Sequence, residues 1–265
     1  MNSNETSLLI ERRPHVARVT LNRPELRNAF SEELINELTT AFRGFSTDEQ
    51  LRCVVLAASG KAFCAGADLN WMRQMAHYSH DDNLADASRL ADMLFAIYQC
   101  PVPVIARVQG DVYAGGVGLV AVSDIVVAVD SAHFCLSEAR LGLLPATISP
   151  YVIKTMGEQA ARRYFVTAER FTASKAHALG MVHELVKPEE LGSTVDAMVA
   201  SIVNNGPQAV RACKKLVIDF SNQAIDAKLR ADSAQRIAKV RASAEGKEGV
   251  QSFLNKREPD WLVKP

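Results

Sequence analysis

The 265-residue chain has no excess of either charge, because its 30 Lys and Arg residues balance its 30 Asp and Glu residues. Without a net positive charge, a protein lacks the general electrostatic attraction that draws chains to nucleic acids and to anionic membranes. The sequence also lacks any run of roughly 18 or more apolar residues, the length that a transmembrane helix needs. We therefore expect neither a nucleic acid nor a membrane as a partner.

Cysteine and metal-binding patterns are also sparse. The five cysteines are an odd number without CxxC spacing, and most lie in apolar runs, which indicates buried thiols in a reducing compartment. The N-terminal residues MNSNETS are polar and include an acid, unlike a secretory signal. The six histidines show no HExxH or other metal-ligand spacing. These features predict a cytoplasmic protein without a metal site.

Apolar periodicity predicts an α/β protein. Strands alternate with helices through the first two-thirds of the chain, the pattern of a mostly parallel sheet. The clearest strands are expected at 16–21, 52–58, 104–108 and 125–129. From about residue 149 most segments read as helices, interrupted by a strand at 182–186. We predict a core over residues 1–195 and a C-terminal helical segment over 196–265 that packs on partner subunits.

A first glycine-containing passage, FCAGADLNWMRQM at residues 63–75, leads from a strand into a helix. Asp68 is placed to cap a helix that begins at about Leu69. Small residues let another molecule approach the main chain, and the start of a helix leaves backbone N–H groups unpaired. Such a place holds negative charge well, although a tight turn without a ligand would have the same pattern.

A second passage of this kind, QGDVYAGGVGL at residues 109–119, lies in the same predicted domain. Two converging backbone N–H groups form an oxyanion hole, in which each donor typically contributes about 3 kcal/mol to lowering the barrier. Ala67 and Gly115 are the candidate donors, and a thioester carbonyl is a suitable ligand. The GxGxxA pattern from Gly116 also fits a dinucleotide fingerprint, but the preceding strand ends at Val108, too early for that motif.

Glu138 is the candidate acid–base group. It is the only acid between Asp130 and Glu158, and apolar residues flank it. A partly buried carboxylate there would have a raised pKa and could transfer protons. The alternative is an ordinary surface pair with Arg140. Ser137 has no nearby histidine in a nucleophilic pattern, and the cysteines lack an obvious electropositive setting, so a covalent mechanism is not supported.

Taken together, the motifs of this chain resemble the enoyl-CoA hydratase/isomerase (crotonase) family. The resemblance extends from about residue 8 to 261 and rests on an ordered set: Asn22-Arg23-Pro24, Asn28-Ala29-Phe30, residues 63–69, Gly110, Gly115-Gly116, Phe134, Glu138, Gly142-Leu143, Pro145, Phe253 and Lys256-Arg257. It implies a ββα superhelix with a C-terminal helical segment. It also implies a homotrimer or homohexamer.

The resemblance implies a role for each candidate residue. The N–H groups of Ala67 and Gly115 would bind the acyl-CoA thioester oxygen, and Glu138 would match the second catalytic glutamate of the family. Coenzyme A would be part of the substrate, and no separate cofactor is implied. The residues expected to contact the CoA portion are Ala65, Asp68, Leu69 and Asn70, together with Lys256, which sometimes reaches CoA phosphate across a subunit interface, and Arg27. Asp68 is expected to cap a helix rather than to catalyse.

One position departs from the family pattern. Typical hydratases carry a first catalytic glutamate in a GGGxE motif, and Gly118 occupies its place here. The sequence around these motifs resembles that of bacterial hydratases of branched glutaconyl-CoA esters. We therefore expect hydration of a 3-methylglutaconyl-type ester, with Gly118 opening space beside C3 and removing a negative charge. A Δ3,Δ2-enoyl-CoA isomerase that uses Glu138 alone, or a non-catalytic acyl-CoA-binding protein, are the alternatives.

Overall fold

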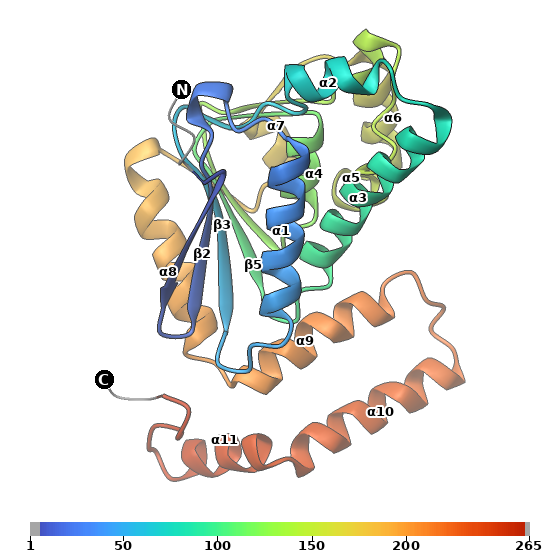
Figure 1. Cartoon of the computed structure of the whole chain (residues 1–265). Helices are drawn as coiled ribbons and strands as arrows, with labels where there is room; N and C mark the ends of the chain where they lie inside the picture. Colours follow the sequence, from blue (N-terminus) through green and yellow to red (C-terminus); the bar gives the residue numbers. More distant parts are fainter. Residues whose placement is uncertain (1–5, 263–265) are drawn as a thin grey trace.

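A six-stranded sheet forms the centre of the protein (Figure 1). The computed structural model describes residues 6–262, so residues 1–5, with most of the polar N-terminus considered above, and 263–265 lie outside it. Only the first pair of strands is antiparallel; the others pair in parallel. In spatial order the strands are β1 (Leu8–Arg13), β2 (Val16–Leu21), β3 (Cys53–Ala58), β5 (Val104–Val108), β7 (Ile125–Val129) and β10 (Glu184–Val186).

A second, four-stranded sheet lies beside the first and was only partly predicted. Its strands, in order, are β4 (Ala62–Cys64), β6 (Asp111–Tyr113), β8 (His133–Cys135) and β9 (Phe171–Thr172). Each of β3, β5 and β7 is followed along the chain by a strand of this second sheet and then by a helical segment. This repeated ββα order confirms the predicted superhelix. The strands β4, β6 and β9 have no more than three residues, too few for a period-two pattern to stand out.

Helices cover the sheets and bury their apolar faces. The helix α1 begins after Ser31, whose Oγ accepts a hydrogen bond from the N–H of Leu34 at 3.2 Å, and it packs against α3. In the core α4 is short and buried from Gly116 to Ala121. The helical elements up to residue 190 are η1 (Pro24–Leu26), α1 (Glu32–Phe45), α2 (Leu69–Met75), α3 (His80–Tyr98), α4 (Gly115–Ala121), η2 (Glu138–Leu141), α5 (Ser149–Met156), α6 (Glu158–Thr167), α7 (Ala173–Ala178) and η3 (Pro188–Glu190).

The last four helices are α8 (Leu191–Val203), α9 (Pro207–Phe220), α10 (Ala227–Ala242) and α11 (Ala244–Leu254). The helix α8 packs on β3, β5 and β7 and runs across the boundary that we predicted at residue 195. Lys214 of α9 is anchored to the core by an ion pair of 2.6 Å with Asp124. Figure 1 shows α10 and α11 on the far side of α9 from the sheet.

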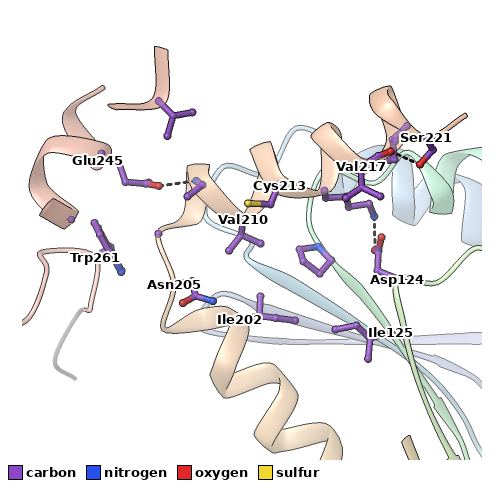
Figure 2. A pocket seen from close by; sticks show the side chains of 18 of the residues that line it. Asp124, Ile125, Ile202, Asn205, Val210, Cys213, Val217, Ser221, Glu245 and Trp261 are labelled. Atoms are coloured by element: carbon purple, nitrogen blue, oxygen red, sulfur yellow. Dashed lines mark hydrogen bonds and ion pairs between the residues drawn. The ribbon is translucent and has the colours of Figure 1, made fainter. Parts of the chain in front are cut away.

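A cavity of about 840 Å³ is lined by residues of α9, of α11 and of the base of the core (Figure 2). Its walls are mostly apolar, with Ile125, Val210 and Trp261 among them, and the Asp124–Lys214 pair also borders it. None of the predicted site residues lines this cavity. Within residues 6–262, no helix combines the length and the apolar character that crossing a bilayer demands.

Candidate active site

Ala67 is held by an isolated parallel bridge to Phe30. The backbone N–H of Phe30 donates to the carbonyl of Gly66 at 2.7 Å, and the N–H of Asp68 donates to the carbonyl of Phe30 at 2.8 Å. In a parallel pairing of this kind, the residue between the two bonded neighbours directs its own N–H away from the partner. The N–H of Ala67 finds no backbone acceptor within residues 6–262 and is available to a ligand.

Gly115 is the first residue of α4, where a backbone N–H has no acceptor inside the helix. The preceding residue, Ala114, has a positive φ of 47°, which turns the chain sharply from β6 into the helix. A Cβ atom on Gly115 would lie 2.8 Å from Cε2 of Phe30, so only glycine fits against that ring. Phe30 thus contacts both candidate donors, one through its main chain and the other through its ring.

The two glycine passages lie against each other. A Cβ atom on Gly66, which has a φ of 91°, would come within 2.9 Å of the Cβ of Ala114. One on Gly116 would lie 2.7 Å from the Cβ of Cys64. The structure therefore brings together two segments that are about 50 residues apart in the sequence, as the oxyanion-hole hypothesis requires. Burial raises the pKa of Cys64 to about 12, so this thiol is not a nucleophile at neutral pH.

Asp68 acts as a helix cap. Its carboxylate accepts a hydrogen bond of 2.7 Å from the N–H of Asn70 and forms an ion pair of 2.9 Å with Arg23. Arg23 also donates to the carbonyl of Ala29 at 2.8 Å, which ties the cap to the segment that holds Phe30. Only 5% of Asp68 is exposed, so a proton-transfer role toward a substrate is not supported.

Asn28 supports the first glycine passage through hydrogen bonds, although its motif alone did not indicate this role. It is fully buried, accepts a hydrogen bond from the N–H of Arg23, and donates to the carbonyls of Ser59 and Ala62. Asn28 and Phe30 both belong to the NAF motif, so the signal was present in the sequence. What it could not show is that these residues position the passage instead of binding the ligand.

Glu138 is the first residue of η2 and is half-buried. Its Oε2 atom is buried and accepts no hydrogen bond from residues 6–262. Burial raises the pKa of Glu138 above its ordinary value, and a hydrogen bond from its own backbone opposes this shift only in part. The alternative pairing with Arg140 does not occur, because Arg140 donates to the carbonyl of Ala168 at 2.6 Å. A carboxylate with these surroundings is suited to proton transfer.

The prediction of open space beside Gly118 is wrong. A Cβ atom on this residue would lie 2.3 Å from Cγ2 of Ile148 and 3.4 Å from Cδ2 of Leu94. Gly118 is buried, and the space beside it is filled by these two side chains. The sequence shows the missing glutamate but not the residue from another segment that fills its place. Gly118 is therefore a packing position in this structure, and it offers no room for a substituent on a substrate.

The residues predicted to contact CoA lie at two separate places. Ala65 donates its N–H to the carbonyl of Arg27 at 3.0 Å, so these two residues adjoin, and Leu69 and Asn70 are exposed on the first turn of α2. Lys256 follows α11, which Figure 1 shows at the opposite end of the molecule from α2. The structure therefore does not bring Lys256 to the other candidates within one chain.

A cavity of about 620 Å³ lies beside the first turn of α2. Asp68, Asn70 and Trp71 line one side, and the acids Glu32, Glu33 and Glu37 of α1 line the other. Three glutamates would repel a phosphate group, so this cavity is not a suitable site for the phosphates of CoA.

Comparison with known proteins adds to this geometry. The model of the enoyl-CoA hydratase/isomerase family matches residues 11–264. This chain belongs to that family. An enoyl-CoA hydratase from Shewanella pealeana has the same fold with a TM-score of 0.93, at 41% identity over 96% of each chain.

Two curated relatives are also similar over almost their full length. The 2,3-dehydroadipyl-CoA hydratase of Escherichia coli is 31% identical, covering 97% of this chain and 98% of the relative. The mevalonyl-coenzyme A hydratase sidH of Aspergillus fumigatus is 31% identical, covering 94% of this chain and 92% of the relative. As a member of the enoyl-CoA hydratase/isomerase family, this protein is an enzyme that acts on acyl-CoA thioesters.

Proposed function

We propose that this enzyme adds water across the C2=C3 bond of a branched enoyl-CoA ester of the 3-methylglutaconyl type. The observation that supports this proposal is the contact between the two glycine passages in a fold that also presents Glu138, whose buried Oε2 atom accepts no hydrogen bond from residues 6–262. Two N–H donors and one acid are the groups that such a reaction needs.

In the proposed mechanism, the thioester oxygen accepts hydrogen bonds from the N–H groups of Ala67 and Gly115. These bonds stabilise the negative charge that develops on this oxygen, and they make C3 electrophilic. Glu138 holds a water molecule, removes its proton as the oxygen attacks C3, and returns a proton to C2. Because burial raises the pKa of Glu138, its conjugate acid gives up that proton at a pH closer to neutral than a free glutamate would.

The substrate class rests on charge at position 118. With glycine there, no carboxylate from α4 repels the second carboxylate of a glutaconyl ester. The buried side chains of Ile148 and Leu94 fill the space beside Gly118, so this position supports the proposal through the missing charge and not through room for the branch. The names of the two curated relatives, which refer to dehydroadipyl and mevalonyl esters, are compatible with a substrate other than a simple straight-chain ester.

The presence of one acid also favours a second candidate, a Δ3,Δ2-enoyl-CoA isomerase. In that reaction Glu138 would carry a proton between C2 and C4, and no solvent oxygen would enter the product. Turnover in ¹⁸O-labelled water separates the two reactions, because only hydration incorporates the label. Binding of acyl-CoA esters without turnover of any of them would instead indicate a non-catalytic binding protein.

The decisive experiment compares kcat/KM for 3-methylglutaconyl-CoA and crotonyl-CoA. A strong preference for crotonyl-CoA would contradict the proposed substrate class. Glu138→Gln should lower kcat by about 10²-fold or more while leaving ester binding nearly unchanged, since proton transfer by one group typically contributes 10²–10⁴-fold. Glu189→Gln, at an exposed glutamate far along the chain, is the matched control and should keep full activity.

We also propose that the active enzyme is a cytoplasmic homotrimer or homohexamer, with α10 and α11 packing on a neighbouring subunit. In such an assembly Lys256 could approach the CoA of a neighbour and Arg27 the CoA of its own subunit. Light scattering measures the assembly. Lys256→Ala and Arg27→Ala should each raise KM for the ester with little change in kcat, because both groups would contact a part of the substrate that does not react.

A further inference from the structure

Phe30 joins the two glycine passages through different parts of the same residue. Its N–H donates to the carbonyl of Gly66 at 2.7 Å, and its carbonyl accepts a bond of 2.8 Å from the N–H of Asp68. These two hydrogen bonds lie on either side of Ala67, which pairs with Phe30 in parallel, so they fix the direction of the Ala67 N–H. The first candidate donor is therefore held by the main chain of residue 30.

The segment that carries Phe30 is itself anchored. Ala65 donates its N–H to the carbonyl of Arg27 at 3.0 Å, which adds a third main-chain bond between this segment and the first passage. The next residue, Ser31, caps α1 by accepting a hydrogen bond from Leu34. Phe30 is 1% exposed, so its ring is enclosed in the core and cannot turn out to solvent. The ring therefore projects from a main chain that is fixed on both sides.

The ring of Phe30 reaches the second passage at the other candidate donor. A Cβ atom on Gly115 would lie 2.8 Å from Cε2 and 3.0 Å from Cδ2 of the ring, so the main chain of Gly115 rests against these two atoms. Just before the donor, Ala114 donates its N–H to the carbonyl of Cys135 at 2.8 Å, which ties the passage to β8. The second passage is thus held by a hydrogen bond before the donor and by the ring at the donor.

Two further contacts bring the passages together directly. Gly66 lies against Ala114, and Gly116 lies against Cys64, in each case too close for a Cβ atom on the glycine. Two such contacts do not by themselves define the tilt of one passage on the other. The ring of Phe30 supplies a third contact, and three contacts that are not in line fix one rigid body against another.

We propose that Phe30 is a positioning residue that sets the distance and the tilt between the two N–H donors. Its ring is a spacer of fixed size between the main-chain pairing at Ala67 and the start of α4. A smaller side chain would leave a gap beside Gly115 into which α4 could shift, and a misplacement of about 1 Å can cost about 10²-fold in rate. The inference rests on the proposed function, because both N–H groups are taken to bind the thioester oxygen.

The probe for the donors is acetoacetyl-CoA, a thioester that loses a proton from C2 to give an enolate with a near-ultraviolet absorption band. Two N–H groups on the thioester oxygen favour this enolate, so the ionised fraction of the bound ester reports their convergence without a hydration step. Phe30→Leu should lower the ionisation constant of the bound ester by about tenfold, because one donor is displaced. The value of kcat for hydration should fall by a similar factor with little change in KM.

Phe42→Leu is the matched control. Phe42 is also 1% exposed and loses the same atoms, but it lies near the end of α1, about 15 Å along the helix axis from its first residue. Both variants should lower the melting temperature to a similar extent, because each leaves a cavity in the core. Only Phe30→Leu should change the ionisation constant and kcat, which separates positioning from a purely structural role. Phe30→Met keeps more of the volume and repeats the test should Phe30→Leu fold poorly.

Gly115→Ala tests the contact between the ring and the second passage. In the wild-type background it should lower kcat by about tenfold or more, because the added methyl group pushes against the ring. In a Phe30→Ala background the methyl group has room. The same change should there have less than half its effect on the logarithm of kcat, since residues in contact are not additive.

Two results would overturn the inference. One is an unchanged ionisation constant in folded Phe30→Leu, and the other is an equal effect of Gly115→Ala in both backgrounds. Failure of the proposed function would look different. If the wild-type enzyme formed the enolate but hydrated no ester, the reaction class would be wrong and the positioning role would stand. If it formed no enolate with bound acetoacetyl-CoA, the pair of donors and the positioning role would both be wrong.

Discussion

Asn28 offers a sharp test of how the first glycine passage is held. Replacing it with alanine removes three hydrogen bonds: 2.9 Å from the N–H of Arg23, 2.8 Å to the carbonyl of Ser59 and 2.9 Å to that of Ala62. The carbonyl of Ala62 keeps a bond of 3.0 Å from Gln109, so the groups that lose a partner are the N–H of Arg23 and the carbonyl of Ser59, both part-buried. Each such loss costs roughly 1–3 kcal/mol.

The backbone of Asn28 adds to this cost. Its φ of 55° is in the left-handed region, which asparagine tolerates better than alanine by about 1 kcal/mol. The two losses and the backbone cost sum to about 3–7 kcal/mol. Because both polar groups are only part-buried we take the lower end, which corresponds to a fall in melting temperature of about 10 °C for a chain of this size. Because Asn28 also supports the segment that holds Ala65 and Phe30, kcat/KM should fall as well.

Two variants separate the cost of the lost hydrogen bonds from the cost of the left-handed backbone. Asn28→Gly has no penalty for a positive φ and should be about 1 kcal/mol more stable than Asn28→Ala. Asn222→Ala, at an exposed asparagine with a φ of 66°, carries only the backbone penalty. Differential scanning calorimetry at one protein concentration gives the melting temperatures. If Asn28→Ala melted within about 2 °C of Asn222→Ala, the three hydrogen bonds of the Asn28 side chain would not stabilise the site as we argue.

Two further predictions concern titration and the C-terminal helices. Because burial raises the pKa of Glu138, kcat/KM for hydration should rise with pH to a plateau, and the midpoint of this rise should lie above 4.5, the ordinary pKa of a glutamate. The same shift means that ionised Glu138 destabilises the fold. The contribution of Glu138 to the free energy of unfolding is fully present below its unfolded-state pKa and is lost as the pH rises through its folded-state pKa. Glu138→Gln should therefore be more stable than the wild type at pH 7 and no more stable near pH 4, as measured by urea unfolding. The reverse order would refute the claim that burial raises the pKa of this carboxylate. Lys214→Met should lower stability by about 1–2 kcal/mol, because it leaves the partly exposed Asp124 without its partner, and adding Asp124→Asn should restore most of the loss. A fully additive double variant would show that the pair is not coupled.

The sequence was sufficient to predict the order of the helices and the longer strands, but not to predict the second sheet. Strands such as β3 and β7 are continuous apolar runs, and the start of α1 is marked by Ser31, so local patterns predict them. The three residues of β6 lie inside the second glycine passage, which we described only as a loop into a helix. Pairing of so short a strand depends on β4 and β8, which are distant in the sequence.

The candidate site shows the same limit. The identities of Glu138, Ala67 and Gly115 follow from motifs, whereas contacts that hold the two candidate donors in place come from another segment, that of Phe30. Ile148 is the clearest case, since nothing in the neighbourhood of Gly118 shows that a side chain from the start of α5 fills its space. Local sequence predicts which groups are present, and the tertiary packing decides what surrounds them.

The position of Phe30 has a consequence for how this enzyme can change. Backbone donors cannot be adjusted by exchanging their own side chains, and Gly115 tolerates no side chain at all beside the ring. The spacing of the two donors is instead set by a residue that need not touch the substrate. Variation in the spacing of the two candidate donors, whether in natural divergence or in the laboratory, is therefore most accessible through residue 30.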